Sequence, residues 1–154
     1  MGGNGSFIKQ YGGVPADKRE FTPVDKIDGH KILIHENDVH QNKTPMNSNT
    51  KDTIYLCGKI DEKSNAVNVS IIAIYKNNLL VRTVDIETDR DGNIIPFNNK
   101  DGTHAHNWDY DSKKNEVGRK SHKGSNHLEP TNEEMTLAKK IVEYNKKRVI
   151  WKEQ

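Results

Sequence analysis

The chain has 154 residues, which is enough for one domain with its own hydrophobic core and gives no reason to expect two. Its apolar fraction is only 32%, so we expect a small core with long polar connections. The 24 basic and 22 acidic residues leave a net charge of +2, which excludes a strong global attraction to nucleic acid, and a single cysteine, Cys57, excludes an internal disulfide.

The N-terminal part, residues 1–29, is rich in glycine and proline and has few apolar side chains. This composition favours neither helix nor sheet, so we expect a flexible N-terminal arm ahead of a single domain over residues 30–154. The first short strands of that domain are expected at residues 30–35 and 53–59. The polar residues 37–52 between them are expected to form an exposed loop.

The strongest structural signal is a β-hairpin formed by residues 67–76 and 79–87, which are rich in β-branched and aromatic side chains. Asn77 and Asn78 between the two runs tolerate the positive φ angles of a type I′ turn. Both faces of the hairpin are partly apolar, so we expect it to lie centrally in its sheet.

Arg82 interrupts the apolar pattern of this hairpin. A two-residue turn pairs Tyr75 with Leu80 and places Arg82 opposite Ala73. A buried charge needs a partner or a ligand, which makes Arg82 a candidate for binding phosphate or a partner protein. The alternative is an arginine at the sheet margin whose guanidinium reaches water.

The C-terminal part contains the clearest helix signal. Thr131 and Glu134 form a capping box after Pro130, and apolar side chains follow at helical spacing. With the strands, this helix predicts an α+β domain: a mainly antiparallel sheet of four or five strands, with the C-terminal helix packed on one face and the N-terminal arm ahead of it.

Residues 102–127 concentrate side chains that can carry chemistry. They include four of the seven histidines: His104, His106, His122 and His127. They also include an indole, Trp108, and five cations, among them Arg119, Lys120 and Lys123. Imidazoles take up and release protons near neutral pH, and neighbouring cations bind anions, so we expect the functional site in this polar segment.

Three interpretations of the segment compete. The first is metal binding: in a strand, His104 and His106 project from the same face, and Asp109, His122 or His127 completes the ligands. The second is metal-independent cleavage of RNA, and the third is a structural loop whose histidines bond to the backbone while its basic residues are solvated.

Cleavage of RNA needs a base for the 2′-hydroxyl, an acid for the leaving oxygen and a cation for the charged phosphorane. His104 and His106 are the candidates for the proton transfers. Arg119 and Lys120 are candidates for the phosphate, and Trp108 or Tyr110 for stacking on an exposed base.

Three stretches of the chain resemble the C-terminal toxin domains of bacterial polymorphic toxins and their phage-borne relatives. They are the hairpin Ile74-Tyr-Lys-Asn-Asn-Leu-Leu-Val-Arg-Thr-Val-Asp-Ile86, then Gly102-Thr-His-Ala-His-Asn-Trp108, then Gly118-Arg-Lys-Ser-His122. Several such domains are similar to the barnase, EndoU, colicin and RelE superfamily of metal-independent RNases. The opening Met1-Gly-Gly-Asn-Gly-Ser-Phe7 also resembles small proteins found in phages and prophages.

The resemblance, which covers about residues 71–122, implies a phage or mobile-element accessory protein that cleaves RNA phosphodiesters with no metal ion and no other cofactor. We expect catalytic roles for His104, His106 and His122. Binding of phosphate or of a partner is expected from a second set: Arg82, Trp108, Arg119, Lys120 and Lys123. Because the N-terminus lacks a charged and then apolar leader and no apolar run approaches the roughly 20 residues that span a bilayer, we expect a cytoplasmic protein of a bacterial host cell.

The alternative function is a non-enzymatic anti-defence protein, such as an anti-CRISPR inhibitor. It would bind a host nuclease, or capture a nucleotide signal, through its charged loops. Residues 85–91 carry four acidic side chains and would mimic nucleic acid, whereas residues 113–123 carry five basic ones and would act as a clamp. The expected partner is therefore either RNA or a host defence protein.

Overall fold

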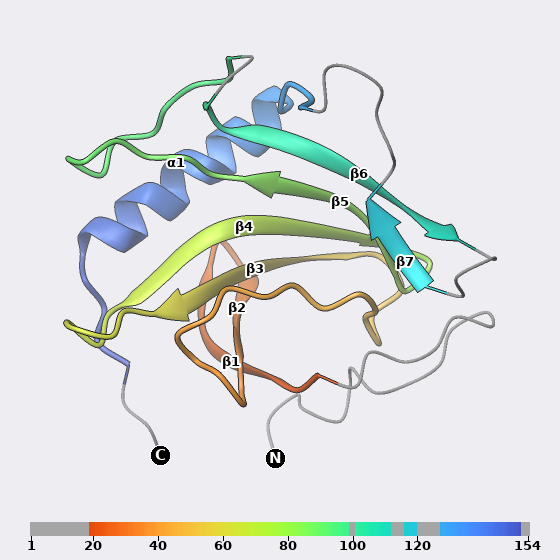
Figure 1. The fold of residues 1–154 in the computed structure, drawn as a ribbon, viewed down its shortest axis with the longest axis horizontal. Coiled ribbons are helices and arrows are strands. Elements are labelled where there is room, and N and C mark those ends of the chain that lie inside the picture. The colour runs from red at the N-terminus through yellow and green to blue at the C-terminus, as the bar shows by residue number, and fades with distance from the viewer. Residues whose placement is uncertain (1–18, 99–100, 112–115, 120–126, 152–154) are drawn as a thin grey trace.

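The computed structural model describes residues 19–98, 101–111, 116–119 and 127–151. These residues form seven strands and one helix (Figure 1). In chain order they are β1 (Phe21–Ile27), β2 (His30–His35), β3 (Thr53–Ile60), β4 (Val67–Lys76), β5 (Leu79–Asp85), β6 (His104–Asp111), β7 (Glu116–Arg119) and α1 (Asn132–Lys146). The expected α+β class, with a mostly antiparallel sheet and a C-terminal helix, is confirmed.

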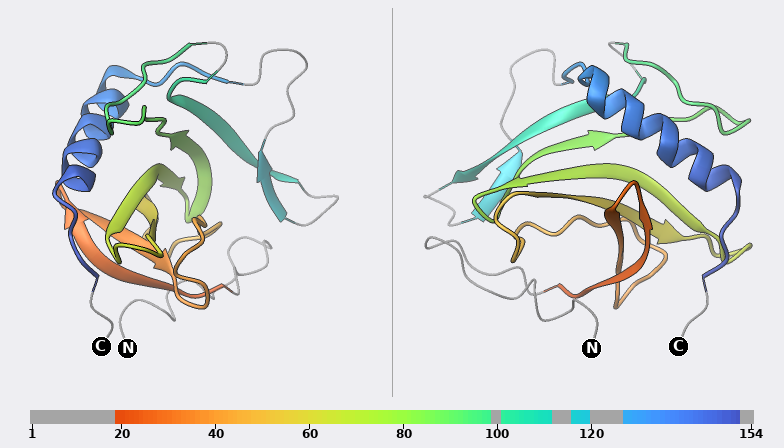
Figure 2. Two further views of the ribbon diagram at one scale, coloured as in Figure 1. Left: turned by 60° about the vertical axis from the view of Figure 1, so that its left-hand side comes forward. Right: turned by 180° about the vertical axis from the view of Figure 1, so that it is seen from behind.

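The strands lie side by side in the order in which they occur in the chain, from β1 to β7. All neighbouring pairs are antiparallel except β2 and β3, which run parallel. The long connection of residues 36–52 makes this possible, because parallel neighbours cannot be joined by a tight turn. The sheet is strongly curved, and α1 runs along one side of it (Figure 2).

The sheet has more strands than the expected four or five, and the first of them lies within the expected N-terminal arm. Phe21 and Ile27 are buried and anchor β1, and Asp28 and Gly29 make the tight turn to β2 with positive φ angles of 54° and 82°. Pro23 is tolerated because β1 is an edge strand and its register shifts next to this residue. Residues 1–18 of the expected arm lie outside the described residues.

The expected hairpin of β4 and β5 is confirmed, and Asn77 and Asn78 adopt φ angles of 51° and 70°. Tyr75 pairs with Leu80 as expected. One extra residue then shifts the register, so that Arg82 lies opposite Ile74 instead of Ala73. This bulge decides which side chains of β5 point toward the helix and which point away from it.

Both faces of the sheet carry buried side chains. A larger cluster lies between the sheet and α1 and includes Ile72, Val84 and Ile141. A smaller cluster on the opposite face includes Leu33, Cys57 and Tyr75. Full burial of one such aliphatic side chain contributes about 1.5–3 kcal/mol, so the larger cluster holds the helix firmly on its face.

The helix begins as its sequence predicts. The Thr131 side chain accepts a hydrogen bond from the backbone N–H of Glu134, and the Glu134 carboxylate accepts one from the backbone N–H of Thr131. Among the described residues no helix has the length and apolar character needed to cross a membrane.

Candidate functional site

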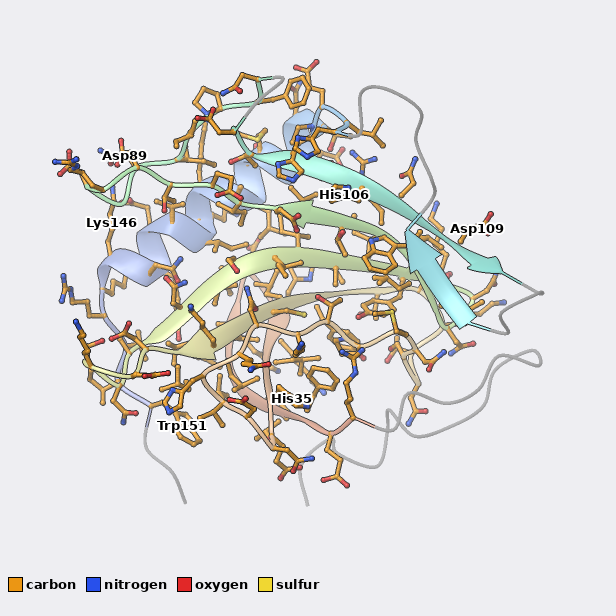
Figure 3. The ribbon with its side chains drawn as sticks, in the orientation of Figure 1. His35, Asp89, His106, Asp109, Lys146 and Trp151 are labelled. Atoms are coloured by element: carbon orange, nitrogen blue, oxygen red, sulfur yellow. The ribbon has the colours of Figure 1, made fainter. Side chains whose placement is uncertain are left out.

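Strand β6 presents two histidines on one face of the sheet. His104 and His106 are two residues apart in an extended strand, so their side chains project to the same side of the sheet. Figure 3 labels His106 on this strand. Ala105 between them is fully buried in the cluster against α1. The two histidines therefore lie on the face opposite the helix. Both are buried, with 7% and 5% of their surface exposed.

Asp85, the last residue of β5, contacts both histidines. It pairs with His104 across the β5–β6 ladder, and His106 is the next residue along on the same face. One carboxylate oxygen, Oδ2 of Asp85, lies 3.3 Å from Nε2 of His104 and 3.3 Å from Nε2 of His106. The Asp85 side chain is 30% exposed, so it is the member of this group that faces solvent.

His127 completes the group from a segment distant in the sequence. Leu128 exchanges two backbone hydrogen bonds with Ala105, of 2.8 and 3.0 Å, which places His127 beside β6. Its ring stacks on His104 with centroids 3.8 Å apart and an angle of 10° between the planes, and it meets the edge of His106. One nitrogen from each of the three rings lies within 4.8 Å of the others. We call Asp85, His104, His106 and His127 the histidine site.

The hydrogen bond of His104 to the backbone determines which of its nitrogens carries a proton. Nδ1 lies 2.7 Å from the carbonyl oxygen of Gly102. A carbonyl only accepts, so Nδ1 donates, and in the neutral ring Nε2 keeps a lone pair. That lone pair faces Oδ2 of Asp85, which is also an acceptor. Two facing acceptors repel unless a proton or a metal ion lies between them.

Arg82 has a protein partner and lies away from the histidine site. Its Nε and NH2 groups donate to the two carboxylate oxygens of Glu134 on α1, at 2.7 and 2.8 Å. This two-bond pairing places the guanidinium on the helix face. The binding of phosphate expected for Arg82 has no support in this arrangement, because two of its donors already pair with Glu134. The partner that sequence analysis expects for a charge at this position is thus a carboxylate of the same chain, and the guanidinium does not simply extend into water, since the Arg82 side chain is only 21% exposed.

Glu134 is held in its charged form by this pairing. Burial alone raises the pKa of the carboxyl, but the hydrogen bonds from Arg82 and from Thr131 outweigh burial and hold the pKa below its ordinary value. The side chain thus caps α1 and fastens β5 to it at the same time.

The other expected binding residues are placed less completely. Trp108 lies on the same strand face as His104 and His106, is half-buried, and donates from Nε1 to the Thr83 hydroxyl at 2.8 Å. Arg119 lies in β7, paired with Trp108 across the ladder. His122, Lys120 and Lys123 lie outside the described residues, so the catalytic role expected for His122 stays a prediction.

The only cysteine offers no alternative nucleophile. Cys57 is fully buried in β3, and burial raises the pKa of its thiol to about 12. At neutral pH it therefore stays protonated, and it packs as a small apolar side chain.

Sequence analysis missed Asp85 as a member of the site. In the sequence this residue belongs to the acidic stretch 85–91, and no local pattern predicts that β6 pairs with β5 and brings His104 opposite Asp85. His127 was considered only as one of three possible metal ligands. The signal in the sequence for this cluster is the spacing of His104 and His106, which share a face in any strand.

Comparisons of the chain with models of protein families, with curated proteins and with solved structures found no match. The function is therefore argued from the histidine site alone.

Proposed function

We propose that the chain cleaves RNA at the histidine site, with His104 and His106 as the pair that transfers protons. The observation that supports this proposal is the convergence of two imidazole Nε2 atoms on one carboxylate oxygen at 3.3 Å each. Two imidazoles whose Nε2 atoms meet at one carboxylate oxygen are close enough to act on the same phosphodiester, one removing a proton while the other supplies one.

The proton transfers of this reaction need no group from outside the chain. The 2′-oxygen attacks phosphorus and the bond from phosphorus to the 5′-oxygen breaks, so one proton leaves the 2′-hydroxyl and one is given to the 5′-oxygen. His104 suits the base role because its Nδ1–H bond to Gly102 leaves Nε2 as the acceptor. His106 is then the acid, and Asp85 stabilises whichever ring carries the extra proton.

The test is cleavage of transfer RNA and total RNA by the purified chain in the presence of a chelator. Wild-type protein is expected to produce fragments with 2′,3′-cyclic phosphate ends. His104→Ala and His106→Ala should each lower the rate by about 10²–10⁴-fold, the usual contribution of one acid or base. His30→Ala is the matched control, because His30 lies on β2 and is no part of the site.

Two results would overturn the proposal. One is RNA that stays intact with wild-type protein, both with chelator and with added divalent metal. The other is cleavage that the double substitution of His104 and His106 leaves unchanged. An inactive chain that forms a stable complex with a host nuclease would instead favour the anti-defence alternative.

A further inference from the structure

We propose that the histidine site binds one divalent transition-metal ion of the Zn²⁺ class, through the side chains of Asp85, His104, His106 and His127. Binding of the ion depends on the positions of these side chains and not on any activity of the chain. The consequence drawn below for RNA cleavage rests on the proposed function.

The spacing of the donor atoms fits a tetrahedral ion. Zn²⁺ holds imidazole nitrogen and carboxylate oxygen at about 2.0–2.1 Å, so two ligands of one tetrahedral ion lie about 3.3–3.4 Å apart. Oδ2 of Asp85 lies 3.3 Å from Nε2 of both His104 and His106. Two edges of the tetrahedron are thus already present. The third histidine nitrogen is within 4.8 Å of the other two, but the His127 ring stacks parallel on His104, so it must turn before its lone pair points at the same ion.

The hydrogen bonding of the site also fits a metal ion. Metal-binding histidines usually donate their second ring N–H to a carbonyl or carboxylate, which fixes the ring and leaves the other nitrogen as the ligand. His104 does this through Nδ1 and the Gly102 carbonyl, at 2.7 Å. An ion between Nε2 of His104 and Oδ2 of Asp85 would replace the repulsion of two facing acceptors by two bonds.

The surroundings hold the ligands in place. His104 and His106 belong to one strand, Asp85 to the neighbouring strand, and His127 is held beside β6 by the two backbone bonds of Leu128. The rings of His104 and His106 are almost fully buried, so these two side chains lose little freedom when an ion binds. Three nitrogens and one carboxylate oxygen favour Zn²⁺, Co²⁺, Ni²⁺ or Cu²⁺ over Mg²⁺ or Ca²⁺, which prefer oxygen ligands.

A bound ion would regulate the proposed RNA cleavage. With four protein ligands the ion has a closed coordination shell, which is typical of structural zinc and leaves no position for a reactive water. Both imidazoles that transfer protons would then be engaged as ligands. Zn²⁺ is therefore expected to switch cleavage off and a chelator to switch it on.

The test of binding uses Co²⁺ alone, without RNA. Titration of the metal-free full chain is expected to give the intense visible d–d absorption of a four-coordinate Co²⁺ ion, with one ion bound per chain and displaced by Zn²⁺. His104→Ala, His106→Ala and Asp85→Ala should each weaken binding by more than the roughly 10–100-fold that loss of an outer hydrogen bond costs. His30→Ala should bind as wild type does, and circular dichroism checks that each variant is folded.

The outcomes separate the two proposals. Absence of Co²⁺ binding by folded wild-type protein, or binding that the substitutions at residues 104 and 106 leave unchanged, overturns the metal site. Cleavage that proceeds equally with Zn²⁺ and with chelator overturns its regulatory role. Tight binding by a chain that never cleaves RNA supports the metal site and contradicts the proposed function.

Discussion

Gly102 controls the orientation of His104 through its carbonyl oxygen, which accepts the Nδ1–H bond. The backbone around Gly102 leaves no room for a side chain. A Cβ atom there would lie 1.9 Å from the carbonyl oxygen of Pro96 and 2.8 Å from the backbone nitrogen of Asn98. Both neighbours are backbone atoms, so they cannot turn away as the end of a long side chain would.

Gly102→Ala is therefore expected to displace this segment and release the His104 ring, while the sheet stays folded. Affinity for Co²⁺ should fall by about 10–100-fold, as it does when an outer hydrogen bond of a metal ligand is lost. Gly92→Ala, in the loop before β6, is the control for backbone strain alone: its φ angle of 82° also disfavours alanine, but the added Cβ would lie 3.8 Å from its nearest neighbour, in the Lys146 side chain. An affinity that Gly102→Ala leaves unchanged would show that the carbonyl does not position the ring.

At the scale of elements, Glu134 connects strand β5 to helix α1. Its carboxylate accepts two bonds from Arg82 and one from the backbone N–H of Thr131. Arg82→Leu would leave this carboxylate partly buried without its main partner. We expect the free energy of unfolding to fall by about 1–3 kcal/mol, the usual cost of an unsatisfied buried polar group.

The same pairing predicts a dependence of stability on pH. The pKa of Glu134 is lowered in the folded state, so the unfolded state takes up the proton first as the pH falls. The stabilisation of the fold by the charged Glu134 carboxylate is thus fully present above its ordinary pKa of 4.5. It is lost as the pH falls through the lower pKa of the folded state. Urea unfolding of wild type and Glu134→Gln, at neutral pH and in this acidic range, measures it.

Glu134→Gln is a suitable comparison because glutamine also completes a capping box. Wild type should be the more stable protein at neutral pH, and the difference should shrink in acid. A difference between the two proteins that stays constant with pH would mean that the charge of Glu134 does not contribute.

Elements with strong local signals could be predicted from the sequence, and elements set by long-range pairing could not. The β4–β5 hairpin follows from Asn77 and Asn78, and α1 follows from its capping box, because these patterns act within a few residues. Strand β1 was missed because Pro23 and nearby glycines favour loops, whereas the burial of Phe21 in a distant cluster decides the outcome. Burial of this kind depends on the whole fold.

The candidate site shows the same division. Strand β6 is not expected from the sequence, but alternation along any strand puts His104 and His106 on one face. Asp85 reaches them because it pairs with His104 across the β5–β6 ladder, and no local pattern predicts that β6 lies beside β5. His127 reaches them through a backbone pair between Leu128 and Ala105, more than 20 residues apart in the chain, for which no local pattern exists.

At the scale of the whole molecule, the two faces of the sheet have different roles in stability and in the candidate site. The face toward α1 carries the larger apolar cluster, and the opposite face carries the histidine site. Metal ligands come from β5, from β6 and from the residue before Leu128, so a bound ion would connect three segments that unfolding separates. Binding to the folded chain alone stabilises it by an amount set by ligand concentration and affinity.

This arrangement predicts that stability and metal binding can be changed independently. Ile141 is fully buried on α1, and Ile141→Ala should lower the free energy of unfolding by about 2–5 kcal/mol through the cavity it leaves. The cavity lies on the helix face, so Co²⁺ affinity should stay at the wild-type value. Zn²⁺ at a free concentration of about 100 times its dissociation constant should then restore about 2.7 kcal/mol.

Chemical denaturation of Ile141→Ala with and without Zn²⁺ measures this recovery, and His104→Ala serves as the control because it retains the core and loses a ligand. Stabilisation of His104→Ala by the same Zn²⁺ concentration would place the ion elsewhere on the chain. A loss of Co²⁺ affinity in folded Ile141→Ala would show instead that the two faces of the sheet are coupled through Ala105. The side chain of Ala105 packs in the cluster that contains Ile141, and its backbone bonds to Leu128 hold His127 in place.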